Sequence, residues 1–134
     1  KLNSENTNFR LCKGIYVEPK EIAFKEKDEV RQNYLTALNK IFDAGNYVGI
    51  ATHDKYLTDN AQKIISERKL SNDKYEFQML YGVTEKLRDQ IKSSGHKIRV
   101  YVPFGEHWYP YSIRRLQENP TMAWYITKSL FLRR

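Results

Sequence analysis

Short apolar runs alternate along this chain with longer segments in which apolar residues recur every three or four positions. The short runs are typical of buried strands, and the longer segments are typical of amphipathic helices. No Asn-Gly or Asp-Gly pair, the usual signal of a tight hairpin, separates neighbouring runs. Because strands that are joined through helices pair in parallel, the pattern predicts an α/β fold with a parallel sheet.

The predicted strands cover residues 9–16, 47–51, 75–81 and 98–103. Asp54 and Thr84 stand where the second and third helices should begin, and Gly45 and Gly95 stand where the first and third should end. Two further helical segments are expected at residues 111–118 and 122–132. The second strand is apolar almost throughout, which predicts cover on both faces of the sheet.

Composition narrows the class of protein. No apolar run approaches the length of about 18 residues that a membrane-spanning helix needs, and the single cysteine, Cys12, cannot form an internal disulfide. The formal net charge of +7 favours an anionic partner, such as nucleic acid, an acidic membrane surface or a phosphate-bearing cofactor. No linker and no repeat divides the chain, so residues 1–134 are expected to form one region.

Polar residues follow the predicted strands at their carboxyl ends, where α/β folds place their functional groups. Arg10 and Lys13 belong to the first strand, where each would meet either an anionic ligand or an acidic side chain from another strand. The residues leave these two alternatives open. Gly14 allows close backbone approach and favours a ligand slightly. His53 precedes a helix start and is more typical of a structural hydrogen bond than of a ligand.

Adjacent arginines, Arg114 and Arg115, lie on a predicted helix and could clamp a carboxylate, although a solvated basic face is the commoner meaning of such a pair. Tyr101, Tyr111 and Leu80 could form an apolar wall beside them. The histidines and the cysteine have no metal-ligand spacing, so no metal is expected. The chain also lacks the motifs of P-loop, dinucleotide-binding and serine-hydrolase folds.

Four segments in order resemble the motifs of the proline dehydrogenase family, in its bacterial form. They read RLCKGIY at residues 10–16, ATHD at 51–54, YEFQMLYG at 75–82, and RVYVPFGEHW with YSIRRLQEN at 99–108 and 111–119. The resemblance implies a (βα)8 barrel of which this chain is the C-terminal half, with about four βα units and terminal helices. The N-terminal half of the barrel would then be a missing partner.

The resemblance also implies oxidation of L-proline to Δ1-pyrroline-5-carboxylate, by hydride transfer to FAD and onward transfer of the electrons to a quinone. A cytoplasmic enzyme would result, associated peripherally with the inner face of the bacterial membrane. The isolated chain would have little activity. The alternatives are a basic α/β module that binds nucleic acid and a half-barrel that serves only as an assembly partner.

Residue roles follow from the same resemblance. Arg10 and Tyr101 would be catalytic, Arg10 beside the nitrogen of the flavin that accepts the hydride. The substrate site would comprise Arg114, Arg115, Tyr101, Tyr111, Leu80 and Glu118. The cofactor site would comprise Arg10, Lys13, Gly14, Tyr16, Ala51, Thr52, His53 and Gln78.

Overall fold

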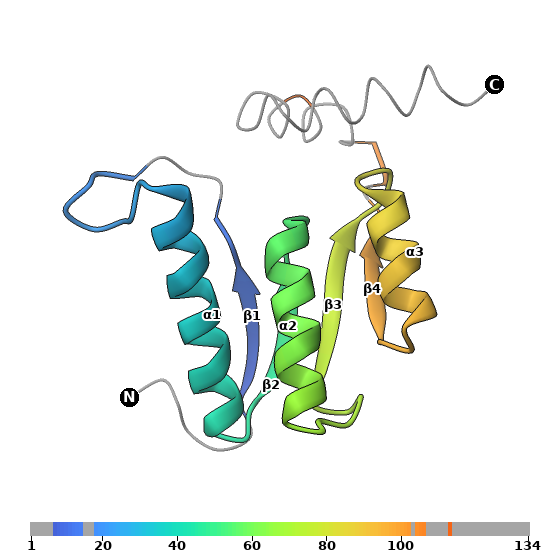
Figure 1. Ribbon diagram of the computed structural model, residues 1–134. Helices are drawn as coiled ribbons and strands as arrows, with labels where there is room; N and C mark the ends of the chain where they lie inside the picture. The colour runs from blue at the N-terminus through green and yellow to red at the C-terminus, as the bar shows by residue number, and fades with distance from the viewer. Residues whose placement is uncertain (1–6, 15–17, 103, 107–112, 114–134) are drawn as a thin grey trace.

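The computed structural model describes residues 7–14, 18–102, 104–106 and 113 of the chain. In this described part four parallel strands alternate with three helices (Figure 1). The strands lie in the sheet in chain order: β1 (Asn8–Cys12), β2 (Tyr47–Ala51), β3 (Tyr75–Leu80) and β4 (Ile98–Tyr101). Each strand pairs in parallel with the next, which confirms the predicted α/β class and parallel sheet.

The connecting helices are α1 (Lys27–Asp43), α2 (Lys55–Glu67) and α3 (Glu85–Ser93). All three cover the same face of the sheet (Figure 1), as crossovers of one hand between neighbouring parallel strands require. On the other face, the cover predicted for β2 does not come from a helix in the described residues. Its central residue, Gly49, is buried on the other face beneath the side chain of Gln78.

The hydrophobic core lies between the sheet and the helices. Leu38 of α1, Val48 and Ile50 of β2, Leu57 of α2 and Phe77 of β3 all have no exposed surface. They alternate along the strands with residues of the opposite face, as the pleat of a strand requires. The apolar spacing read in the sequence therefore marks the residues that hold helices and sheet together.

Most of the observed helix ends agree with those predicted from the sequence. Asp54 caps α2 by accepting a hydrogen bond from the Tyr56 amide at 3.0 Å, and Gly45 follows α1 with a φ of +70°, which favours glycine. The prediction that Thr84 caps α3 is wrong: Thr84 directly precedes the helix, but its side chain makes no capping hydrogen bond. Its hydroxyl contacts His53 instead, at 2.9 Å from Nδ1.

The first strand is shorter than predicted and ends at Cys12. Cys12 pairs with Ala51, the last residue of β2, so no partner continues the ladder beyond it. The fourth strand ends at Tyr101 rather than at residue 103. The helices expected at 111–118 and 122–132 lie outside the described residues, residue 113 excepted. Within the described ranges, none of the helices combines the length and the apolar character that a bilayer crossing requires.

We expect the Leu57→Ala substitution to lower the free energy of unfolding by about 2–5 kcal/mol, because it removes buried apolar volume and leaves a cavity. Urea denaturation of the intact protein, meaning residues 1–134 with any sequence that naturally flanks them, measures the change. Ile22→Ala is the control, since Ile22 is 74% exposed. Equal losses in both variants would contradict the position of the core.

Candidate functional site

The face of the sheet opposite the helices carries polar and functional side chains. The strand register places Arg10 beside Gly49 and Gly49 beside Glu76. In the next row toward the carboxyl ends, Ala51 lies beside Gln78, and Gln78 beside Arg99. Residues two apart in a strand share a face, so the predicted wall residues Leu80 and Tyr101, themselves register partners, lie on this face as well.

Arg10 and Gln78, both predicted to lie near the flavin, are in direct contact. The Nε of Arg10 donates a hydrogen bond of 2.8 Å to the side-chain oxygen of Gln78, across a separation of 68 residues in sequence. The strand β2 lies between them in the sheet. Arg10 therefore meets a neutral amide, which is neither of the two partners that the sequence left open.

Gly49 provides the room for this contact. A Cβ atom built there would lie 2.8 Å from the Cδ of Gln78 and closer still to its Nε2. Side-chain atoms do not approach so closely, so any larger residue would displace the Gln78 amide. The absence of a side chain on β2 thus lets a residue of β3 reach across to β1.

Glu76 holds the other end of the Gln78 amide. Its Oε1 accepts a 2.8 Å hydrogen bond from Gln78 Nε2, and Arg99 of β4 donates to both carboxylate oxygens, at 2.6 and 3.1 Å. Only 2% of Glu76 is exposed. Burial acts to raise the pKa of Glu76, but hydrogen bonds from Arg99, Gln78 and Tyr47 outweigh it and lower the pKa below its ordinary value. Glu76 is therefore an anion at neutral pH.

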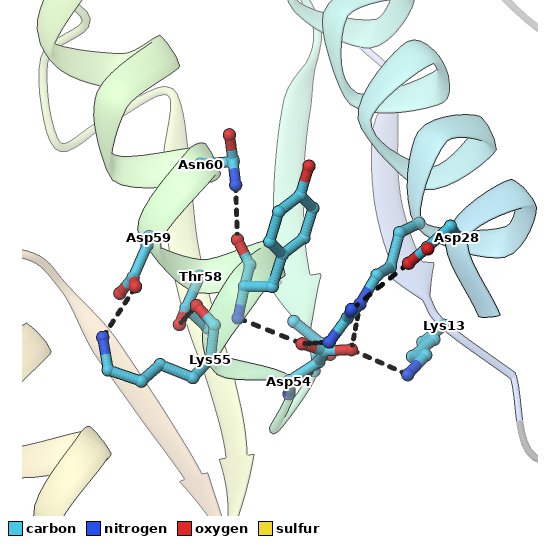
Figure 2. Close-up of polar contacts among 10 residues, drawn as sticks. Lys13, Asp28, Asp54, Lys55, Thr58, Asp59 and Asn60 are labelled. Carbon is cyan, nitrogen blue, oxygen red and sulfur yellow. Dashed lines mark hydrogen bonds and ion pairs between the residues drawn. The ribbon is translucent and has the colours of Figure 1, made fainter.

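A second polar cluster lies where β1 and β2 end, around Asp54 (Figure 2). Lys13 approaches one Asp54 oxygen at 2.8 Å, and Arg31 of α1 donates from Nε and Nη2 to both oxygens at 3.0 Å. The Arg31 guanidinium also lies 4.7 Å from the centre of the Tyr56 ring. Lys13 thus takes the internal ion pair, one of its two predicted partners. Burial tends to raise the pKa of Asp54, but these bonds hold it far below its ordinary value.

His53 connects the ends of β2 and β3. Its Nε2 accepts a hydrogen bond of 3.1 Å from the Leu80 amide, so Nδ1 carries the proton and donates to the Thr84 hydroxyl at 2.9 Å. Burial lowers the pKa of His53 to about 4. Thr84 has a φ of +47°, a conformation that costs energy for a β-branched residue. This neutral histidine thus links the predicted wall residue Leu80, the last residue of β3, to Thr84 in the turn that follows.

Of the other predicted site residues, some are described by the structure and the rest are not. Gly14 follows Lys13 with a φ of +83°, and Thr52 is buried, with its hydroxyl accepting from the Asp54 amide at 3.1 Å. Among the described residues, those predicted to bind the cofactor thus lie on β1, β2 and β3 or just beyond the carboxyl ends of these strands. The remaining predictions lie outside the described residues: Tyr16, Tyr111, Arg114, Arg115 and Glu118.

Sequence reasoning missed four residues of these clusters: Gly49, Glu76, Arg99 and Arg31. A signal existed for Glu76, because a carboxylate between Tyr75 and Phe77 in a strand needs a cationic partner if it is buried. The partner itself could not be read from the sequence, because it depends on the strand register.

Comparison with known proteins gives the family. The family profile described as proline dehydrogenase matches residues 3–126. The chain belongs to the proline dehydrogenase family. It is 36% identical over 129 residues to the proline dehydrogenase of Deinococcus radiodurans, covering 96% of this chain and 42% of that protein. It is 42% identical over 120 residues to proline dehydrogenase 2 of Bacillus subtilis, covering 90% of this chain and 40% of that protein.

A third relative, proline dehydrogenase 1 of Bacillus subtilis, is 32% identical over 130 residues, which are 97% of this chain and 43% of that protein. The chain therefore spans between 40% and 43% of the length of these three relatives. The proline dehydrogenase resemblance read from four motifs is thus confirmed, while the roles of individual residues stay predictions.

For the Asp54 cluster, we expect Asp54→Asn to lower the free energy of unfolding by about 1–3 kcal/mol at pH 7, because Lys13 and Arg31 lose their anion. Asparagine can still cap α2. A depressed pKa stabilises the fold fully above the ordinary carboxyl value of 3.8, and the benefit is lost as pH falls below it. Urea denaturation at pH 7 and pH 3 should therefore show a smaller difference between wild type and variant at pH 3.

Asp59→Asn is the matched control for Asp54→Asn. Asp59 pairs with Lys55 at 2.6 Å, but both side chains are at least half exposed, so the expected loss is below about 0.5 kcal/mol. A loss in Asp54→Asn that equals the control, or that grows as the pH falls, would contradict the assigned role of the cluster.

For His53, we expect its imidazole to protonate near pH 4 in an NMR titration, because burial opposes the charged form. With the folded pKa lowered, the stability that neutral His53 contributes is complete above pH 6.5 and is lost as pH falls toward 4. Thr84→Ala is the comparison variant: it removes the acceptor of Nδ1 but not the burial, so the midpoint should stay below 6.5. A wild-type midpoint at 6.5 would contradict this environment.

Proposed function

We propose that the protein oxidises L-proline to Δ1-pyrroline-5-carboxylate, with FAD as the hydride acceptor and a quinone as the acceptor of the electrons. Family membership over residues 3–126 supports the reaction. The single observation that carries the proposal is the position of Arg10, a guanidinium on the helix-free face that is held through Nε by the neutral amide of Gln78.

The donor set of this face suits a flavin. Toward the described residues, the Arg10 guanidinium is bound through Nε, so its other N–H donors would be kept for a ligand. Its charge would stabilise the negative charge that arrives with a hydride. Gly14, with a positive φ after Lys13, lets a backbone come close to a cofactor. FAD would supply the redox chemistry, and this chain's residues would bind and orient it: Arg10 and Gln78 at the ring, and residues 13–16 and 51–53 along the remainder.

The substrate site would lie next to this face. Leu80 and Tyr101 are paired in register at the carboxyl ends of β3 and β4, where they would contact the ring of proline and exclude water. Arg114 and Arg115 would clamp the carboxylate of proline with charge-assisted hydrogen bonds. Tyr111 would complete the apolar wall, and Glu118 would orient one guanidinium.

The described sheet supports the half-barrel proposal. Its edges are β1 and β4, and the residues at the carboxyl end of β4 and just beyond it are exposed, Tyr101 by 51% and Val102 by 49%. Parallel strands with helices on one face are the arrangement of a barrel wall, with the helices outside and the other face inside. We propose that further βα units complete this barrel, and that the whole associates peripherally with the membrane that holds its quinone.

To test the reaction, the intact protein is purified and assayed for visible flavin absorbance and for proline-dependent reduction of a quinone analogue. We expect both. A second test replaces the matched segment of Bacillus subtilis proline dehydrogenase 2 with this chain, which supplies the remainder of a barrel from a relative. Absence of flavin and of proline oxidation in both proteins would contradict the proposal, and salt-dependent nucleic-acid binding would then favour the basic-module alternative.

The clamp is tested within the same assay by Arg115→Met. Loss of a charge-assisted hydrogen bond costs about 1.5–3 kcal/mol, so the Michaelis constant for proline should rise roughly 10- to 100-fold. Arg88→Met is the control, because Arg88 pairs with Glu85 and Asp89 on the surface of α3. An unchanged Michaelis constant in Arg115→Met would remove this residue from the proposed clamp.

A further inference from the structure

Arg10 is the end of a chain of hydrogen bonds that crosses the whole described sheet. The chain runs from Arg99 on β4 to Glu76 and Gln78 on β3, and from Gln78 over Gly49 of β2 to Arg10 on β1. We propose that Glu76 is a positioning residue for Arg10, acting through the Gln78 amide across the gap at Gly49. The inference rests on the proposed function, because it concerns the charge that Arg10 presents to the flavin.

The two partners of the Gln78 amide determine which way it points. An ionised carboxylate can only accept hydrogen bonds. Glu76 is an anion, so it must face the amino group of Gln78, as the 2.8 Å contact with Nε2 shows. The amide oxygen then points to the other side, where Arg10 Nε donates to it. Reversal of the amide would place its N–H donors against the guanidinium of Arg10 and its oxygen against the carboxylate of Glu76. The carboxylate therefore fixes the orientation that Arg10 needs.

The carboxylate of Glu76 is itself held rigidly. Arg99 donates to both oxygens of Glu76, and Lys97 lies 3.8 Å from Oε2. A two-pronged contact with a guanidinium fixes the plane of a carboxylate as well as its distance. With 2% exposure, Glu76 has little freedom to turn. The orientation is therefore transmitted to Gln78 from a group that cannot readily move.

The basic residues of the two clusters differ in the charge of their partners. Lys13 and Arg31 both contact the carboxylate of Asp54, which offsets part of their charge. Arg10, by contrast, is held by a neutral amide, while the charge of Glu76 is directed to Arg99 and Lys97. Within the described part of the chain, the network thus fixes Arg10 in place without supplying it with a counter-ion. A full positive charge at a fixed point is what a site needs to stabilise negative charge on a bound ring.

Gly49 makes the inference testable without a change of charge. In Gly49→Ala the new methyl group would displace the flexible end of Gln78, and the φ of Gly49 does not lie in the left-handed region, so the backbone accepts alanine. We expect the amide to leave Arg10 while Arg10, Glu76 and Arg99 all stay present. Glu76→Gln is the complementary variant, since it keeps the shape of the side chain but removes the carboxylate that orients Gln78.

The measurement is the two-electron reduction potential of the flavin in the intact protein, determined by spectroelectrochemistry, together with the dissociation constant of FAD. We expect Gly49→Ala, Gln78→Ala and Glu76→Gln each to weaken stabilisation of the reduced flavin about tenfold, a shift of about 30 mV to more negative potential. Glu67→Gln is the matched control, because Glu67 on α2 is 62% exposed and makes only a 3.8 Å pair with Lys63. Its potential should equal that of the wild type.

A double-mutant cycle separates positioning from a general structural effect. In a Gln78→Ala background, alanine at position 49 has no amide to displace, so it should cause no further shift in potential. The inference is overturned if Gly49→Ala or Glu76→Gln leaves the potential unchanged, or if Gly49→Ala shifts the potential equally with and without Gln78. A wild-type protein that takes up no FAD would overturn the proposed function itself, whereas the preceding outcomes, in a protein that oxidises proline, overturn only the role of Glu76.

Discussion

Packing of α1, α2 and α3 against a single face of the parallel sheet is the constraint on which the rest of the structure depends. It divides every strand into a side that faces the helices and a side that faces away from them, because successive residues point to opposite faces. In β3 the apolar side holds Tyr75, Phe77 and Met79, and the polar side holds Glu76 and Gln78. Charged groups can occupy the second set because the core is complete without them. The site is thus a consequence of where the helices lie.

The sequence predicted the elements well and their ends less well. Apolar residues spaced three or four apart predicted α1, and two of them, Tyr34 and Leu38, are buried in the core. The spacing predicts burial because a helix that packs on a sheet buries one face. The end of β1 was placed too late because a strand stops where its partner stops, at Ala51 of β2. Thr84 was expected to cap α3, but the contact with His53 determines where its hydroxyl points. Both errors concern long-range contacts, which local sequence does not encode.

The sequence predicted several residues of the candidate site, but not the hydrogen bonds that join them. Position at strand ends was enough to single out Arg10 and Lys13, because parallel strands bring their carboxyl ends together, and the family resemblance added Gln78. The partners of these side chains were beyond reach, since they depend on register. Arg99 meets Glu76 only because β4 pairs with β3 in the observed alignment, and a shift of one residue would turn Arg99 to the helix side.

The choice of an amide at position 78 has a physical reason. A carboxylate there would lie on the same face of β3 as Glu76, two residues earlier, and the two like charges would repel each other at close range. It would also form an ion pair with Arg10 and offset the charge that the proposed flavin site uses. An aliphatic side chain would leave both Arg10 and Glu76 without this contact. Glutamine donates to the anion and accepts from the cation, so one neutral side chain joins two opposite charges without neutralising either.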